Sequence, residues 1–163
     1  MTSYCPSCYK PKCQSYWQKT VFICVATRHH WHQIPPNAAS TAIEGYGSQI
    51  VQPKSLTGHV VLGYYKISDF SPPAPNIFQE ICAATFITSY TTVCENRRRG
   101  ITCRTFVLSV LSELCARGHI AWQKASSISS FVESLERVIR DHSIRADCSN
   151  GGMTITDCGS TLS

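Results

Sequence analysis

The chain has 163 residues, of which 43% are hydrophobic and 15% charged, and its formal net charge is +5. A charged fraction well below the usual ~25% excludes a disordered, highly charged segment, and the length suits one folded domain. No stretch approaches the ~18 consecutive apolar residues of a membrane span, and the first residues lack the pattern of a signal peptide. We therefore expect a soluble protein of the cytoplasm.

Three regions are expected along the chain. Residues 1–19 form a loop-rich arm that contains cysteines, residues 20–142 form an α+β domain, and residues 143–163 form a flexible tail. The tail is expected because Ser, Thr, Gly and Asp replace apolar residues there.

Strands are predicted in the first part of the domain, where β-branched and apolar residues form short runs. These runs lie at residues 20–26, 41–46 and 59–67. The segment from Arg28 to His32 follows the first run closely and ends before Pro35 and Pro36.

Helices are predicted after the proline-rich stretch at residues 72–75. Asn76 is expected to cap a helix from Ile77 onward, with Gln79 completing a capping box. A short strand is expected at residues 90–94.

The clearest helix is predicted from Cys103 to Arg117, because its apolar residues recur at helical spacing. Thr102 is expected to cap it, and Gly118 to end it in a left-handed conformation.

Residues 119–122 are expected to return as a strand, and Ser130 to begin a last helix that runs to His142. Strands followed by helices predict an α+β fold: a single domain with an antiparallel sheet that two or three helices cover on one side.

Cys103 is the first candidate catalytic residue. It stands where a helix begins, and the backbone N–H groups and helix dipole there favour a thiolate nucleophile. Its alternative is structural, because Cys103 is also in phase with the apolar residues of that helix.

The segment His29-His30-Trp31-His32 is the second candidate, because imidazoles serve as bases or metal ligands near neutral pH. On an extended chain His30 and His32 point the same way and His29 points the opposite way. His59, on a neighbouring strand candidate, is a possible orienting residue. A cluster without catalytic duty is the alternative for these histidines.

The N-terminal arm contains Cys5, Cys8 and Cys13, a spacing that weakly suggests zinc. Reduced thiols are the alternative, and most of the ten cysteines are expected to be reduced core residues. No cofactor is expected. The run from Arg97 to Arg99 is too short for a nucleic-acid surface, so we expect a solvated loop or a small anion site.

The order of His30-Trp31 and the later Cys103 resembles that of circularly permuted papain-like thiol enzymes, the lecithin–retinol acyltransferase kind. In that class a histidine on an early strand is the base and a cysteine at a helix start is the nucleophile. The resemblance implies His30 as base, Cys103 as nucleophile and His59 as a possible orienting residue. The class usually has Asn before its cysteine, where this chain has Thr102.

A second resemblance is to a family of small, mostly uncharacterised fungal proteins with a His-Trp strand and a Gly/Cys-Arg-aromatic helix start. It rests on residues 29–31, 65–68, 100–107 and 118–120. Some such families belong to secondary metabolism, which implies a role in tailoring small molecules.

Three functions are therefore expected. The first is a small-molecule tailoring enzyme with a Cys103/His30 pocket for acyl transfer, hydrolysis or cyclisation of a largely apolar substrate. The second is a cyclase or isomerase that shapes an intermediate without covalent bonding. The third is a binding module with zinc on its arm. The substrate-binding candidates are Trp31, His32, Arg99 and Arg104.

Overall fold

The computed structural model describes residues 22–24, 27–33, 43–50, 63–67, 69–122, 125–148 and 154–157. The chain forms two compact units. Unit 1 takes residues 1–51 and 75–109, and unit 2 takes residues 52–74 and 110–163.

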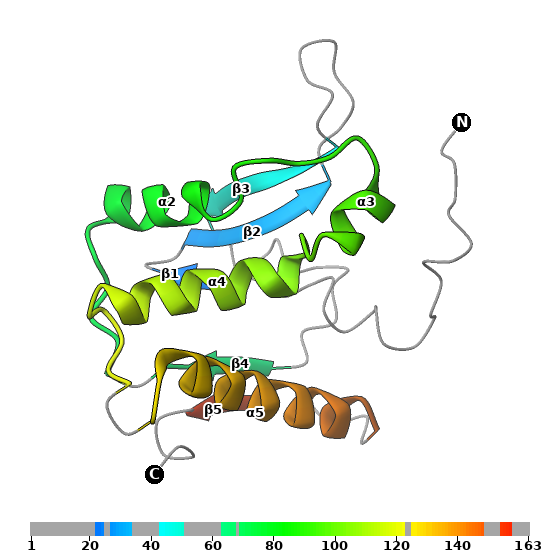
Figure 1. Ribbon diagram of the computed structural model, residues 1–163. Helices are drawn as coiled ribbons and strands as arrows, with labels where there is room; N and C mark the ends of the chain where they lie inside the picture. Colours follow the sequence, from blue (N-terminus) through cyan, green and yellow to red (C-terminus); the bar gives the residue numbers. More distant parts are fainter. Residues whose placement is uncertain are drawn as a thin grey trace. The chain divides into compact units, whose positions relative to one another are not determined.

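Unit 1 contains an antiparallel sheet in the order β1-β2-β3 (Figure 1). Its strands are β1 (Phe22–Cys24), β2 (Thr27–Gln33) and β3 (Glu44–Ile50). In the register of β2 and β3, Trp31 lies opposite Tyr46 and His30 opposite Gly47. The whole histidine segment thus belongs to the central strand of the sheet.

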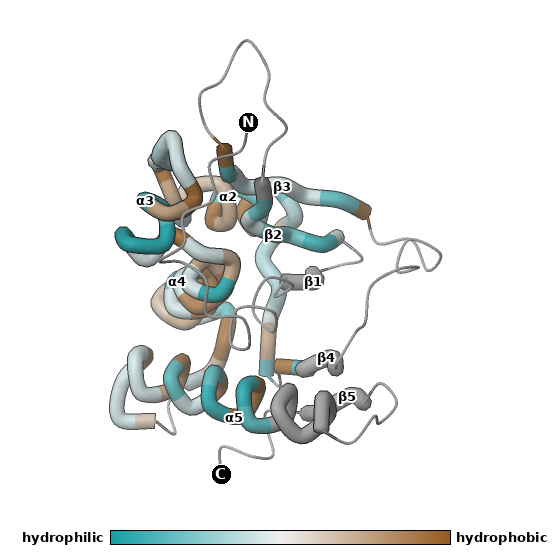
Figure 2. Tube along the Cα trace, turned by 90° about the vertical axis from the view of Figure 1, so that its right-hand side faces the viewer, coloured by the Kyte–Doolittle hydropathy of each residue, from teal (hydrophilic) through white to brown (hydrophobic). Residues whose placement is uncertain are grey.

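Helices cover one face of this sheet. They are α2 (Pro75–Ala84), α3 (Val93–Arg98) and the first half of α4 (Cys103–Ala116), and they lie on the same side of β2 and β3 (Figure 2). The α+β class and the antiparallel sheet with helices on one side are thereby confirmed.

The helix starts differ in part from the prediction. Helix α2 begins at Pro75, so Asn76 lies inside its first turn and does not cap it; proline suits that first position because its missing N–H has no helical partner there. The predicted strand at residues 90–94 is wrong. Thr92 caps α3 instead, and its Oγ1 accepts a hydrogen bond of 3.1 Å from the Glu95 N–H.

Helix α4 confirms the prediction made from its apolar spacing. The Oγ1 atom of Thr102 accepts a hydrogen bond of 3.0 Å from the Thr105 N–H, and Gly118 has the left-handed φ of 77°. The side chains of Cys103, Phe106 and Val107 are buried in unit 1.

A buried polar network holds α3 to β3 in unit 1. Glu44 Oε1 and Oε2 accept hydrogen bonds of 2.7 and 3.2 Å from the Arg97 guanidinium, and Oε2 also accepts one of 2.7 Å from Asn96 Nδ2. The backbone N–H of Tyr90 donates to Asn96 Oδ1 at 2.8 Å, and Arg97 also donates to the carbonyl of Ile101 at 2.6 Å. Asn96 and Glu44 are almost fully buried.

Unit 2 contains the second half of α4, α5 (Ile128–Cys148) and a parallel pair of strands, β4 (Gly63–Lys66) and β5 (Thr154–Asp157). Residues 119–122 do not form a strand, since only Ile120 pairs, in an isolated bridge with Phe70. Apolar side chains of α4 and α5 form its core: Val110, Leu111, Leu114, Cys115, Phe131, Val132 and Leu135 are buried.

Helix α5 begins before the predicted position, because Ser127 caps it: Ser127 Oγ accepts a hydrogen bond of 3.1 Å from the Ser130 N–H. Its hydrophilic and hydrophobic residues alternate along the described part (Figure 2), as expected for a helix with one buried side. Helix α5 and strand β5 both extend into residues 143–163, where the sequence predicts a tail. Among the described residues, no helix has the length and apolar composition that crossing a bilayer requires.

Candidate functional site

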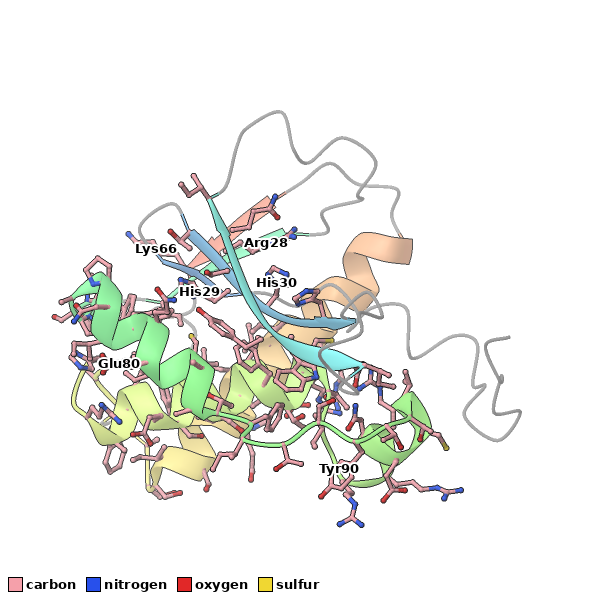
Figure 3. All side chains as sticks on the ribbon, turned by 90° about the horizontal axis from the view of Figure 1, so that it is seen from above. Arg28, His29, His30, Lys66, Glu80 and Tyr90 are labelled. Carbon is pink, nitrogen blue, oxygen red and sulfur yellow. The ribbon has the colours of Figure 1, made fainter. Side chains whose placement is uncertain are left out.

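Strand β2 presents two chemically different faces, because successive side chains of a strand point to opposite sides. His29 and Trp31 face the helices, where the His29 ring meets Phe78 edge-on at 4.7 Å and Trp31 packs 6.3 Å from Phe106. Arg28 and His30 point to the other side of the strand (Figure 3). The predicted alternation of the histidines is confirmed.

The second face, which we call the polar face, combines Arg28, His30 and His32 of β2 with the residues opposite them on β3. The register places Gln49 opposite Arg28, Gly47 opposite His30 and Gly45 opposite His32. No carboxylate stands at any of these six positions.

Three nitrogen atoms of the polar face are buried and lack hydrogen-bond partners among the described residues. They are Arg28 Nε, His30 Nδ1 and His32 Nδ1. Leaving a buried polar group unpaired costs about 1 to 3 kcal/mol, so such groups in native proteins usually meet a water, an ion or a ligand. The guanidinium itself is held in place, since Arg28 Nη2 donates to Gln49 Oε1 at 3.1 Å.

Gly47 leaves room for the two imidazoles to lean together. The rings of His30 and His32 have centroids 4.7 Å apart. A Cβ atom at position 47 would lie 2.6 Å from His32 Cε1, 3.0 Å from His32 Nδ1 and 3.3 Å from His30 Nε2. The two rings therefore occupy the space above the glycine, with His32 Nδ1 and His30 Nε2 as the nitrogens nearest to it.

The electrostatics of the polar face keep His30 uncharged near neutral pH. Burial, followed by the charges of Arg28 and His32, lowers the pKa of His30 to about 4, while a hydrogen bond to the Arg28 backbone acts in the opposite direction. A neutral imidazole carries one N–H donor and one acceptor nitrogen, so His30 can hydrogen-bond to either kind of group.

The helix-facing side of β2 is more apolar; its histidine has a hydrogen-bond partner, whereas Trp31 Nε1 is buried and has none among the described residues. His29 Nδ1 shares a hydrogen bond of 2.8 Å with the Tyr46 hydroxyl, and burial lowers the pKa of His29 and raises that of Tyr46. Trp31 meets Phe86 edge-on at 5.0 Å. Trp31, expected to bind substrate, is a buried residue with 7% of its surface exposed, and its role in substrate binding stays a prediction.

The pairing of Cys103 with His30 stays a prediction. Cys103 is the first residue of α4, buried with 8% exposed, and it shares the helix side that carries Phe106 and packs toward Trp31. His30 projects from the face of β2 that is opposite to the face of Trp31. The histidine on the side of Cys103 is His29, whose Nδ1 is already bonded to Tyr46.

The two arginines predicted to bind substrate lie away from β2 in sequence and differ in environment. Arg99 donates to Glu95 Oε1 at 2.7 Å and its guanidinium stands 4.4 Å over the Tyr90 ring. Arg104 is half-buried in the first turn of α4. Neither belongs to the polar face, and their role in substrate binding stays a prediction.

Other predicted site residues lie outside the described part of the chain: His59, and the arm cysteines Cys5, Cys8 and Cys13. Within the described residues, no three side chains among His, Cys, Asp and Glu are grouped as a metal site would need.

No protein-family model, curated protein or solved structure matches the chain.

The sequence singles out His30 and His32 as candidate site residues, but not Arg28 and Gly47. The signal for Arg28 was present, since Arg28, His30 and His32 alternate along one extended segment and must share a face. Gly47 could not be found in this way, because its place opposite His30 depends on the register of β2 with β3.

Proposed function

We propose that this protein binds a small molecule on the polar face of unit 1, without a covalent thiol intermediate. The observation that carries the proposal is the row of three buried, unpartnered nitrogens on β2, at Arg28, His30 and His32. A ligand that supplies their missing partners would recover free energy that the unliganded protein forgoes. The cytoplasmic location expected from the sequence is part of this proposal.

The tailoring role implied by the sequence resemblances fits this proposal in its non-covalent form. His30 and His32 stand side by side and can donate or accept hydrogen bonds, as is required of groups that orient a substrate. Ring closure or isomerisation of such a bound molecule would need no nucleophile.

The binding proposal can be tested with a fragment screen in which the NMR signals of the histidine rings are recorded. We expect hits that shift the Cε1–H resonances of His30 and His32 and that are lost in His30→Ala and His32→Ala. The matched control is His119→Ala, which removes a histidine of unit 2 and should keep every hit. Hits that persist in both β2 variants would overturn the proposal.

A thiol-dependent tailoring enzyme is the second candidate, and the start of α4 at Cys103 favours it. Iodoacetamide at pH 6, followed by peptide mass mapping, separates the two candidates. The thiol mechanism requires Cys103 to react ahead of Cys94, the half-buried thiol of α3. The binding proposal expects Cys94 to react first, because Cys103 is the more buried of the two.

A further inference from the structure

We propose that the group bound by the polar face is an oxyanion, a carboxylate or phosphate carried by a small molecule, held by Arg28 together with the imidazoles of His30 and His32. This inference rests on the proposed function and names the chemical class of its ligand.

The chemistry of Arg28 indicates that the ligand carries a negative charge. A guanidinium has only donors, so the buried Nε of Arg28 can be satisfied by an acceptor and by nothing else. Gln49 holds the guanidinium through Nη2 and leaves Nε directed elsewhere. Arginine N–H groups bind carboxylate and phosphate oxygens through short, charge-assisted hydrogen bonds.

The two histidines extend this donor set along the strand. Residues 28, 30 and 32 occupy successive positions on one face, which a strand separates by about 6.5 Å. In the tautomer with hydrogen on Nδ1, His30 and His32 present N–H donors at the two nitrogens that lack partners. One oxyanion, with two or more acceptor oxygens, can meet several of these donors at once.

Gly45 and Gly47 add no side chains to this face. They lie on β3 opposite His32 and His30, so only the backbone of β3 faces these two side chains there. A Cβ at position 47 would lie only 3.3 Å or less from nitrogens of both rings. The rings of His30 and His32 therefore lie over Gly47, close to each other and to the β3 backbone.

The charges on this face disfavour a metal ion as the occupant. Two imidazoles alone supply half of a tetrahedral zinc set, and the positive charge of Arg28 stands on the same face. No carboxylate at the six positions of the face offsets that charge. The positive charge of Arg28 attracts an anion to this face and repels a cation.

Matched small ions test the inference on the full chain in a low-chloride buffer. Acetate and inorganic phosphate are titrated against acetamide, the neutral counterpart of acetate, and against zinc chloride. The readouts are the Cε1–H signals of His30 and His32 and the Nε–H signal of Arg28. We expect saturable shifts of all three with acetate or phosphate and none with acetamide; the stronger of the two oxyanions identifies the source.

Substitutions locate the effect. Arg28→Gln should weaken oxyanion binding at least tenfold, which corresponds to about 1.4 kcal/mol, while Arg140→Gln, which alters an exposed arginine of α5, should leave it unchanged. If Arg28→Gln does not fold, the comparison of acetate with acetamide on the wild-type protein decides alone.

The outcomes separate the two proposals. Equal shifts with acetate and acetamide, or shifts with zinc alone, would overturn the proposal that the ligand is an oxyanion. A fragment hit at His30 and His32 would still support the proposal that this face binds a small molecule. If neither the ions nor any fragment shifts these signals, both the oxyanion proposal and the binding proposal are overturned.

Discussion

His30 is neutral in the folded protein over a pH range in which an unfolded histidine is charged. Its pKa falls from 6.5 to about 4, first through burial and then through the charges of Arg28 and His32. Between those two values the unfolded state binds a proton that the folded state does not. The free energy of unfolding must therefore decrease as the pH falls from 6.5 toward 4.

His30→Gln tests this linkage, because glutamine keeps hydrogen-bonding atoms and cannot titrate. We expect urea unfolding of the variant to lose less stability than the wild type between pH 6.5 and 4. Part of the slope should remain, since burial also lowers the pKa of His29. Ile50→Ala, an exposed apolar change on β3, should keep the wild-type slope. An unchanged slope in His30→Gln would refute the assignment.

Gly47 is required by the side chains across from it rather than by its own backbone conformation. A Cβ there would stand 2.6 Å from His32 Cε1, closer than any ordinary contact, so the His32 ring must turn away. We expect Gly47→Ala to cost about 1 kcal/mol in urea unfolding, at the low end for overpacking because a ring can rotate. It should also abolish ligand-induced shifts of His32.

A double-mutant cycle checks the cause of that loss. In a His32→Ala background the obstructing ring is gone, so Gly47→Ala should cost clearly less there than in the wild type. Equal costs in the two backgrounds would show that the effect arises elsewhere.

At the scale of elements, the attachment of α3 to β3 depends on one buried ion pair. The Glu44 side chain is 3% exposed and pairs with Arg97 at 2.7 Å, with Asn96 as a further donor. Removing Arg97 leaves the buried charge of Glu44 uncompensated, so Arg97→Ala should lower the unfolding free energy by about 3 kcal/mol or more. Glu95→Ala breaks a pair of the same length with Arg99 that is exposed, and should cost below about 1 kcal/mol. Similar losses in the two variants would contradict this account.

The elements predictable from the sequence are those whose signals are local. Helix α4 shows a long apolar stripe with a capping threonine before it and a glycine after it, and all three were found. The alternation of His29, His30 and His32 likewise needed only the period of a strand.

The errors in the predicted elements arise where two local sequence signals compete, or where a residue's interaction partner is distant in the sequence. Asn76 and Pro75 both suit the start of α2, and the proline took the first helical position. The run from Tyr90 to Cys94 has the composition of a strand, yet Thr92 and Glu95 form the start of α3, whose Asn96 and Arg97 reach Glu44 more than 50 residues away. The glycines of the polar face could not be predicted from the sequence for the same reason, because the register of β2 with β3 decides which residues lie opposite the histidines.

At the scale of the whole chain, each unit has a buried core of its own, and α4 contributes to both. Phe106, in the half that belongs to unit 1, and Leu114, in the half that belongs to unit 2, are each fully buried. Truncating such side chains to alanine typically costs about 2 to 5 kcal/mol, because the lost contacts leave a cavity. The loss should fall mainly on the unit in which the cavity forms.

Native-state hydrogen exchange measures where that loss falls. Phe106→Ala should lower protection most in β2, β3 and α2, and Leu114→Ala most in α5 and β4, whereas Ser109→Ala, an exposed change in the same helix, should alter neither. Equal loss of protection in all of these elements, from either buried variant, would show that the chain opens as one cooperative body. The ligand-binding face of β2 would then be sensitive to any core substitution, and only those that spare global stability could be used to test it.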